Sequence, residues 1–304
     1  RSLVKRRYRE VKAVDAISFA IGPGEVVGFL GPNGAGKTTT LKMLSGLLYP
    51  TGGQATVLDH IPQKRARAFL GQITLVMGNR NQLQWDIPAL DSFELNRAIY
   101  GLEPATFRRT RDELIGLMEV GDLVKKPVRN LSLGERMKME FIGALLHRPR
   151  VLFLDEPTLG LDITMQRRLR AFVAEYNRRT GATVLLTSHY MADVEALCRR
   201  VIVIHHGRLL YDGGLAGLAE RFAAYKTIGV TLGDAASGAD LSAYGDVVER
   251  DGAHAKLRVP KAETARLTAQ LLADLPISDL TVEDPPVEDV IERVFASGSA
   301  ETRA

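Results

Sequence analysis

The chain has 304 residues, of which 45% are hydrophobic and 25% are charged, and its formal net charge is +4. This composition is ordinary for a globular protein, with length enough for one large domain and a smaller one. Cys198 is the only cysteine, so an internal disulfide is excluded and a reducing compartment is expected. No apolar run approaches the ~18 residues of a membrane-spanning helix, so we expect no transmembrane segment, and no signal peptide is visible.

Three short runs of the sequence are apolar throughout rather than alternating, as strands buried on both faces of a parallel sheet are. They are EVVGFLG at 25–31, VLFLDEP at 151–157 and ATVLLTSH at 182–189, and each leads into a helix-like stretch. A fourth run, RVIVIHHGRLL at 200–210, ends in a Gly turn. In open α/β sheets, ligands bind outside the carboxyl ends of the strands. We therefore expect the ends of the first three strands to form one site.

The segments around this core predict the domain organisation. The stretches 13–25 and 52–60 read as short antiparallel strands with Gly and Pro turns, and 90–148 reads as mostly helical. From about residue 225 the pattern changes to strand-like runs and two amphipathic helices, which predicts a small α+β domain. We therefore expect a first domain at 1–224 and an accessory C-terminal domain at 225–304.

A glycine-rich loop lies between the first predicted strand and a predicted helix. GPNGAGKTT, residues 31–39, fits the pattern G-x-x-x-x-G-K-[ST], whose glycines let backbone N–H groups approach phosphate oxygens. Lys37 would bridge the β- and γ-phosphates of a nucleotide, and Thr38 would place its hydroxyl on Mg²⁺. The predicted nucleotide-binding residues of this loop are Gly31, Pro32, Asn33, Gly34, Ala35, Gly36, Lys37, Thr38 and Thr39.

Polar side chains at the ends of the other two strands complete a predicted hydrolysis site. Asp155 would hold Mg²⁺ through its water shell, and Glu156 would accept a proton from, or orient, the water that attacks the γ-phosphate. Adjacent carboxylates at a strand end also cap helices, but the phosphate loop favours the catalytic interpretation. His189, on the third strand end, is expected to contact the γ-phosphate rather than to be a packed or capping residue.

A second helix start raises a separate question. RNLSLGERMKME, residues 129–140, places Ser132 where it can cap a helix, with Glu135 three residues later to complete a capping box. An exposed helix start is also an anion site. The residues alone do not say which anion this one would face.

With these motifs in order, the sequence resembles the nucleotide-binding subunit of an ATP-binding cassette (ABC) transporter. The resemblance covers residues 8 to about 220 and rests on GPNGAGKTTT, LSLGE, VLFLDEPTLGLD and TVLLTSH. It implies an α/β fold of the P-loop NTPase class, with a parallel-sheet core, an antiparallel β-subdomain and a helical subdomain at about 80–148. It also implies a head-to-tail dimer, with an identical or closely related subunit, that sandwiches two ATP molecules.

The resemblance gives roles to residues outside the phosphate loop. Ser132, Gly134 and Glu135 look like the family's signature motif, which contacts the γ-phosphate bound by the partner subunit. Asp162, in LGLD, looks like the loop that links the two sites across the dimer. Tyr8 looks like the aromatic residue that stacks on adenine.

Two motifs depart from the family's pattern. The usual signature is Leu-Ser-Gly-Gly-Gln, whereas Leu133 and Glu135 occupy the third and fifth places here. Gly134 is retained at the place that the backbone turn needs most. The family also carries a Gln that meets Mg²⁺, and the alignment places Asn79 there with Gln82 three residues later. The metal ligand at this point is therefore either residue.

Further similarities favour one branch of the family. Residues 81–102, the LSLGERM variant and the C-terminal domain look like the ABC-2-type exporter branch, whose partners are separate six-helix permeases. Trp85 lies where that family docks a cytoplasmic helix of the permease, with core packing as the competing interpretation. We thus predict an ATPase, converting ATP and water to ADP and phosphate, that powers export from the cytoplasmic face of the membrane.

Two other functions stay open at this point. One is the ATPase of an importer, and the other is a soluble ABC ATPase that acts on ribosomes or nucleic acid. The single phosphate loop and the short distance from Asn79 to the signature disfavour the soluble class, so no nucleic acid partner is expected. Basic clusters near the start and at 108–111 are expected to be solvated surface charge, with lipid or nucleic acid contact as the alternative. The transported substrate cannot be read from these residues.

Overall fold

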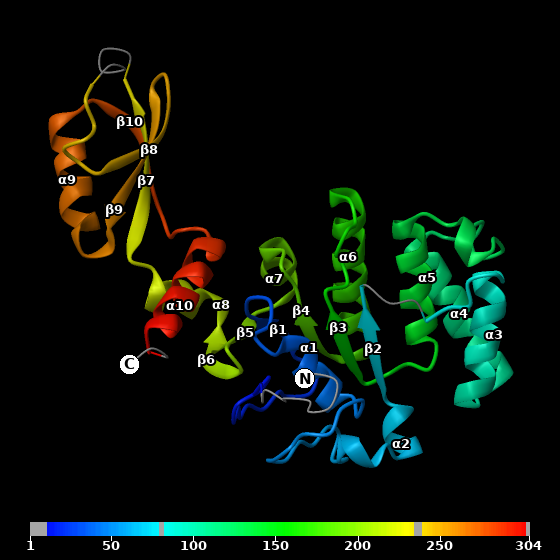
Figure 1. Ribbon diagram of the computed structural model, residues 1–304. Helices are drawn as coiled ribbons and strands as arrows, with labels where there is room; N and C mark the ends of the chain where they lie inside the picture. Colours follow the sequence, from blue (N-terminus) through cyan, green and yellow to red (C-terminus); the bar gives the residue numbers. More distant parts are fainter. Residues whose placement is uncertain (1–10, 79–81, 234–238, 302–304) are drawn as a thin grey trace, which may run out of the picture. The chain divides into compact units, whose positions relative to one another are not determined.

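A computed structural model describes residues 11–78, 82–233 and 239–301 (Figure 1). The chain divides into two compact units, Arg1–Gly213 and Gly214–Ala304. Tyr8 and Asn79, both predicted site residues, lie outside the described residues. Each unit has a sheet and a hydrophobic core of its own, so the two are described separately.

The first unit is built on a six-stranded sheet. Its strands are β1 (Val26–Leu30), β2 (Ile73–Met77), β3 (Val151–Asp155), β4 (Thr183–Thr187), β5 (Arg200–His205) and β6 (Arg208–Gly214). They lie in the order β2-β3-β4-β1-β5-β6, and β2, β3, β4, β1 and β5 pair in parallel (Figure 1). Every residue of β3 is buried, as its apolar run predicts.

Strand register brings the carboxyl ends of three strands to one edge. Asp155, the last residue of β3, pairs with Met77 of β2 on one side and with Thr187 of β4 on the other. β1 lies next to β4 and feeds the loop at 31–36 into the following helix. The polar residues after these strands therefore gather at a single sheet edge.

The first unit has seven α-helices among the described residues, and three of them form a separate group beside the sheet. They are α1 (Lys37–Leu44), α2 (Arg67–Leu70), α3 (Ala89–Tyr100), α4 (Pro104–Met118), α5 (Leu133–Leu145), α6 (Ile163–Thr180) and α7 (Met191–Leu197), with 3-10 turns η1 (Pro62–Lys64) and η2 (Val128–Asn130). Helices α3, α4 and α5 stand together beyond β2, against which α5 packs (Figure 1). These three helices form the helical group that the segment 90–148 predicts.

The prediction of antiparallel strands at 13–25 and 52–60 is wrong for these two stretches. No strand forms in either, and the only pairing there among the described residues is an isolated bridge between Val57 and His60. Their apolar side chains do pack, since Ile17, Phe19 and Ile21 lie against the core around Phe29. The apolar pattern therefore indicated burial, but it could not show that no neighbouring backbone accepts the ladder of hydrogen bonds.

The second unit is a smaller α+β fold. Its elements are α8 (Leu215–Phe222), β7 (Tyr225–Leu232), β8 (Asp246–Asp251), β9 (His254–Pro260), η4 (Lys261–Glu263), α9 (Thr264–Asp274), β10 (Ile277–Glu283) and α10 (Val287–Glu301). The strands form an antiparallel sheet in the order β10-β7-β9-β8, and α9 covers one face (Figure 1). Alternate residues of β7 and β9, such as Ile228 and Leu257, pack there against Leu267 and Leu271.

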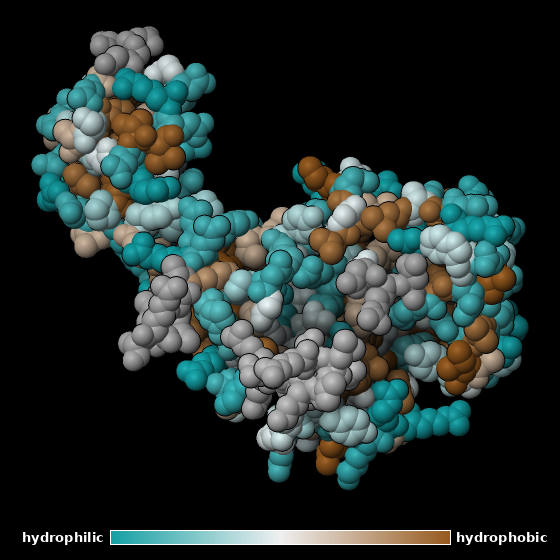
Figure 2. Space-filling view, viewed as in Figure 1, coloured by the Kyte–Doolittle hydropathy of each residue, from teal (hydrophilic) through white to brown (hydrophobic). Residues whose placement is uncertain are grey.

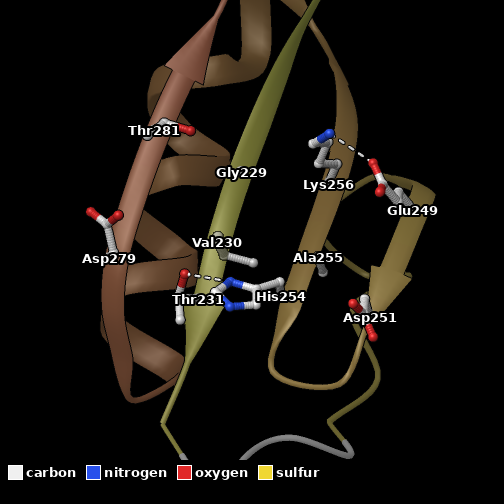
Figure 3. A pocket seen from close by; sticks show the side chains of 10 residues that line it. All are labelled: Gly229, Val230, Thr231, Glu249, Asp251, His254, Ala255, Lys256, Asp279 and Thr281. Atoms are coloured by element: carbon white, nitrogen blue, oxygen red, sulfur yellow. Dashed lines mark hydrogen bonds and ion pairs between the residues drawn. The ribbon is translucent and has the colours of Figure 1, made fainter.

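The opposite face of this sheet is polar and has a shallow hollow above Gly229 (Figure 3). The hollow has a volume of about 200 Å³. Lys256 pairs with Glu249 at 2.7 Å, and Thr231 Oγ1 lies 2.9 Å from His254 Nδ1. Lys256 and Glu249 thus pair with each other, while Asp251 and Asp279 also line the hollow.

Candidate nucleotide-binding site

The glycines of the loop at 31–36 are required by close backbone packing or by a left-handed backbone. Gly34 and Gly36 have φ angles of 80° and 106°, in the left-handed region that disfavours other residues. A Cβ on Gly36 would lie 2.3 Å from Ala13 O, and a Cβ on Gly31 would lie 2.4 Å from Ile204 O. The loop is thus fixed in shape by contacts with segments far away in the sequence.

Lys37, the first residue of α1, reaches back over this loop. Its side chain is buried, and Nζ donates to Gly31 O at 2.5 Å and to Pro32 O at 3.1 Å. Burial lowers the pKa of Lys37, while the nearby carboxylates of Glu156 and Asp155 act in the opposite direction. The ammonium is therefore held at the centre of the loop, between backbone carbonyls and two acids.

Asp155 joins the phosphate loop to β4. Thr38 Oγ1 donates to its Oδ2 at 2.8 Å, and Thr187 Oγ1 donates to its Oδ1 at 2.7 Å. A buried carboxylate with a hydroxyl beside it supplies the oxygen ligands that Mg²⁺ prefers. In the part of the chain that the structure describes, no group of three or more His, Cys, Asp or Glu side chains could hold a metal. Phosphate and water oxygens would therefore have to complete the coordination of a Mg²⁺ ion here.

Glu156 and His189 meet at the same sheet edge. Glu156 Oε1 lies 2.8 Å from His189 Nε2, and both side chains are partly exposed. The Glu156 backbone takes a left-handed φ of 51°, and its N–H donates to Thr187 O at 3.0 Å. A Cβ on Gly78 would lie 2.1 Å from Glu156 O, so the end of β2 packs tightly against this turn. The turn that carries Glu156 is thereby fixed, and its carboxylate lies beside an imidazole.

The signature residues begin helix α5. Ser132 caps the helix, its Oγ accepting from Glu135 N at 3.3 Å while its own N–H donates to Glu135 Oε2 at 2.8 Å. The capping box predicted from the sequence is therefore present. Hydrogen bonding from Ser132 lowers the pKa of the Glu135 carboxyl. No hydrogen bond or ion pair between described residues joins 132–135 to the phosphate loop of the same chain.

Asp162 caps the next helix, α6. Its carboxylate accepts from Met165 N at 2.8 Å. Met165 in turn packs on the signature, because a Cβ on Gly134 would lie 2.9 Å from Met165 Cε. The two predicted dimer-facing motifs therefore lie next to each other at the starts of adjacent helices.

Gln82, the second predicted ligand for the metal, makes hydrogen bonds to β2 and α5. Gln82 Nε2 donates to Leu75 O at 2.7 Å, and Gln82 N donates to the buried Glu140 carboxylate on α5. Assignment of Asn79 or Gln82 to the metal stays a prediction. Trp85 is 45% exposed, which excludes core packing, and Arg136 lies over its ring at 5.4 Å.

Sequence reasoning missed two polar residues that support this edge. Thr187 bridges Asp155 and Glu156, yet a threonine ending an apolar strand carries no distinctive pattern. Asp193, on α7, is 1% exposed and accepts hydrogen bonds from Thr158 and Ser188. An acid four residues after His189 was the only available signal for it.

A glycine loop leading from a parallel strand into a helix, with its threonine hydroxyl bonded to a neighbouring strand-end aspartate, defines a P-loop nucleotide-binding protein. The strand order β2-β3-β4-β1-β5-β6 and the group of helices α3, α4 and α5 are further features by which proteins of this class can be compared. Comparison with known proteins identifies the family.

Residues 14–159 match the family described as ABC transporter, and residues 224–283 match the EvrA-like ABC transporter, C-terminal domain. The ABC transporter ATP-binding protein NatA of Bacillus subtilis (strain 168) is 36% identical, covering 71% of this chain and 89% of that protein. The Nod factor export ATP-binding protein I of Burkholderia pseudomallei (strain 1710b) is 36% identical over 71% of each chain. The solved structure of cbiO1 from Clostridium perfringens, part of the ABC transporter complex cbiONQ, has a TM-score of 0.62 at 27% identity, covering 69% of this chain and 85% of that one.

This chain belongs to the ABC transporter family, as one of its ATP-binding subunits. The predicted family and the predicted fold class are both confirmed. Over the described residues, no helix is at once long enough and apolar enough to cross a bilayer.

Proposed function

We propose that this chain hydrolyses ATP to power export through separate membrane permeases, as a head-to-tail dimer at the cytoplasmic face of the membrane. The observation that carries hydrolysis is the contact of 2.8 Å between Glu156 Oε1 and His189 Nε2, at the edge where Thr38 meets Asp155. Such a set can position a metal-bound nucleotide and activate water. Similarity to a Nod factor export ATP-binding protein supports the export direction.

Nucleotide binding is assigned to the phosphate loop and Asp155. Lys37 Nζ, bonded to Gly31 O and Pro32 O, would turn to the β- and γ-phosphates of ATP. Thr38 and Asp155 would hold Mg²⁺, which supplies charge neutralisation on the phosphates. Because the loop backbone is fixed by packing, little reorganisation is needed when the phosphates bind.

Hydrolysis is assigned to Glu156 and His189. With one carboxylate oxygen against His189 Nε2, the other oxygen of Glu156 is left to accept a proton from, or to orient, the attacking water. His189 would also contact the γ-phosphate. The turn that carries Glu156 is fixed by Thr187 and Gly78, so Glu156 stays in position to activate the water that attacks the γ-phosphate.

The signature is assigned to the partner's nucleotide. A helix N-terminus carries about half a positive charge and unpaired N–H groups, which suit a γ-phosphate. Ser132 and Gly134 begin α5 and share no hydrogen bond with the phosphate loop of their own chain among the described residues. A second copy, placed head to tail, would bring this helix start to the ATP bound by the first.

The helical group offers a surface for the permease. Figure 2 shows apolar surface over this part of the first unit, and its exposed apolar side chains include Trp85, Ile87, Leu95 and Ile99. This surface is tied to the signature helix, because Arg136 lies over the Trp85 ring and Glu140 accepts from Gln82 N. Movement of a docked permease helix would therefore reach Ser132 through α5.

The proposal is tested with the full chain, alone and co-purified with the membrane protein encoded beside its gene. We expect Mg²⁺-dependent phosphate release that rises in the complex, and ATP-driven dimerisation of the Glu156→Gln variant by light scattering. Phosphate release no faster than that of Lys37→Ala, in both preparations, would overturn the ATPase assignment. Co-sedimentation with ribosomes in place of a membrane complex would overturn the export assignment.

A further inference from the structure

A buried carboxylate lies behind the Glu156–His189 contact. Asp193, in the first turn of α7, is 1% exposed. Its Oδ1 accepts from Arg170 Nη1 at 2.6 Å, and its Oδ2 accepts from Ser188 Oγ at 2.7 Å and from Thr158 Oγ1 at 2.5 Å. Three donors, one of them a cation, compensate the burial of this charge.

The two hydroxyl donors belong to the segments that carry the proposed catalytic groups. Thr158 follows Glu156 by two residues, and Ser188 directly precedes His189. Since a carboxylate can only accept, both hydroxyls are the donors to Oδ2 of Asp193, and the distance of 2.7 Å from Ser188 Oγ is shorter than its 3.3 Å to Tyr190 O. A single oxygen atom thus links the turn after β3 to the turn after β4.

Arg170 fixes the orientation of that carboxylate. It lies on α6, and its side chain is 13% exposed in the ion pair with Asp193. Because Oδ1 is bonded to the guanidinium, Oδ2 is left to face the two hydroxyls. The ion pair therefore orients Asp193 without itself touching Glu156 or His189.

We infer that Asp193 is a positioning residue for hydrolysis, which keeps Glu156 and His189 in contact by holding Thr158 and Ser188. This inference rests on the proposed ATPase function. Loosening the link would misplace the base relative to the attacking water, and a displacement of 1 Å costs roughly 10²-fold in rate. ATP binding would be unaffected, because the loop at 31–39 makes none of these contacts.

The first test removes the two hydroxyls separately in the full chain, as Ser188→Ala and Thr158→Val. Each is expected to lower kcat at least about 10-fold, with KM for ATP within about twofold of the wild type. The double variant is expected to be no more than about twofold slower than the slower single variant, because both changes break one link. Wild-type kcat in both single variants would overturn the inference.

Thr110→Val is the matched control for Thr158→Val. Thr110 is also a buried threonine, and its hydroxyl accepts from Arg148 Nε at 2.9 Å within the helical group. Its loss should lower thermal stability without changing kcat. If Thr110→Val slowed hydrolysis as much as Thr158→Val did, the effect would be general destabilisation and the inference would fall.

Substitution of the carboxylate itself adds a rescue test. Asp193→Asn keeps only one acceptor oxygen and should lower kcat with KM retained. Asp193→Glu restores both oxygens on a side chain that is one methylene longer, beside a cavity of about 10 Å³ lined by Thr158, Arg170 and Asp193. We expect Glu to recover part of the kcat that Asn loses, and a kcat of Asn equal to that of the wild type would contradict the inference.

A spectroscopic readout separates this inference from the ATPase assignment. The chain has six histidines, so the ring ¹⁵N signals of His189 can be assigned with His189→Gln. Ser188→Ala and Thr158→Val should shift and broaden the His189 Nε2 signal, whereas Thr110→Val should not. If the wild type releases no phosphate, the ATPase proposal falls while this signal still tests Asp193. An unmoved His189 signal in both hydroxyl variants would overturn the inference.

Discussion

The two parts of the first unit that are proposed to face phosphate are built in different ways. At the sheet edge, the hydrogen bonds from Thr38 and Thr187 to Asp155 join segments 117 and 32 residues apart. At the signature, Ser132 and Glu135 satisfy each other across three residues. The first site exists only when the whole sheet is folded, whereas the second is a local helix start that can be presented to another chain. Changes at the sheet edge should therefore act within one chain, and changes at the signature should act between chains.

The largest expected effect is at the sheet edge. Glu156→Gln keeps the size of the side chain but removes the basic carboxylate. Turnover should therefore fall by at least the ~10²-fold typical of losing a general base. ATP affinity, measured by calorimetry, should stay near that of the wild type, since the Glu156 side chain contacts His189 and the contacts of Lys37 with Gly31 O and Pro32 O are kept. Near-normal turnover in the permease-bound variant would contradict the assignment of Glu156 as the general base.

Lys37→Ala should weaken binding rather than chemistry alone. The variant loses the ammonium that lies over Gly31 O and Pro32 O, and a hydrogen bond to a charged group contributes about 1.5–3 kcal/mol. We therefore expect ATP affinity to fall about 10- to 100-fold. Calorimetry measures this directly, with Lys42→Ala on the same helix as the matched control. An unchanged affinity would contradict the position proposed for the phosphates.

The sequence could predict the sheet edge because each of its parts has a local pattern. The loop at 31–39 carries its own spacing of glycines, and an apolar run followed by Asp155 and Glu156 marks a buried strand with a polar end. Thr187 could not be predicted, since its role comes from the register that pairs it with Asp155. The strands expected at 13–25 were wrong because an apolar pattern indicates burial but not a hydrogen-bonding neighbour.

The sequence could also predict the local construction of the signature, because a capping box is fully encoded in residues 132–135. Which nucleotide it faces could not be read from the residues, because that depends on a second chain. The hydrogen bonds of Gln82, one of the two predicted metal ligands, also could not be read from the sequence. Its side chain donates to Leu75 O, a contact that depends on how the backbone turns after β2.

Mixing two inactive variants tests the comparison between the sites directly. Lys37→Ala disables the phosphate loop, and Gly134→Asp puts a carboxylate at the helix start, where its Cβ would lie 2.9 Å from Met165 Cε and 3.1 Å from Met165 Cγ. If the signature acts on the partner's nucleotide, a mixed dimer has both lesions at one composite site and an intact second site. Mixing should then restore activity, up to about half of the wild-type rate per mixed dimer if the two sites turn over independently.

If the two ATP sites can turn over only together, mixed dimers would stay inactive, so crosslinking tests the same arrangement without relying on activity. A cysteine at Ser132 should join one at Thr39 between chains, in a Cys198→Ser and Glu156→Gln background, and ATP should raise the yield. A crosslink within one chain, or none in the presence of ATP, would mean that this helix start faces something else.

The smallest expected effect separates the structural part of the signature from its catalytic part. The hydrogen bond from Ser132 N lowers the pKa of Glu135 in the folded chain. The ionised carboxylate therefore stabilises the folded chain at a pH above 4.5, the pKa of Glu135 in the unfolded chain. This stabilisation is lost as the pH falls through the lower pKa of the folded chain. Glu135→Gln should therefore lower the thermal midpoint slightly at pH 7, and the difference from the wild type should vanish at acid pH. Loss of a helix cap costs typically about 1 kcal/mol, so Ser132→Ala sets the scale of a full loss of capping. If Glu135→Gln lowered stability equally at pH 7 and below the folded pKa of Glu135, the capping box would not depend on this charge. Because the box is local, phosphate release by the variant should stay within a few-fold of the wild type, whereas Gly134→Asp should abolish it.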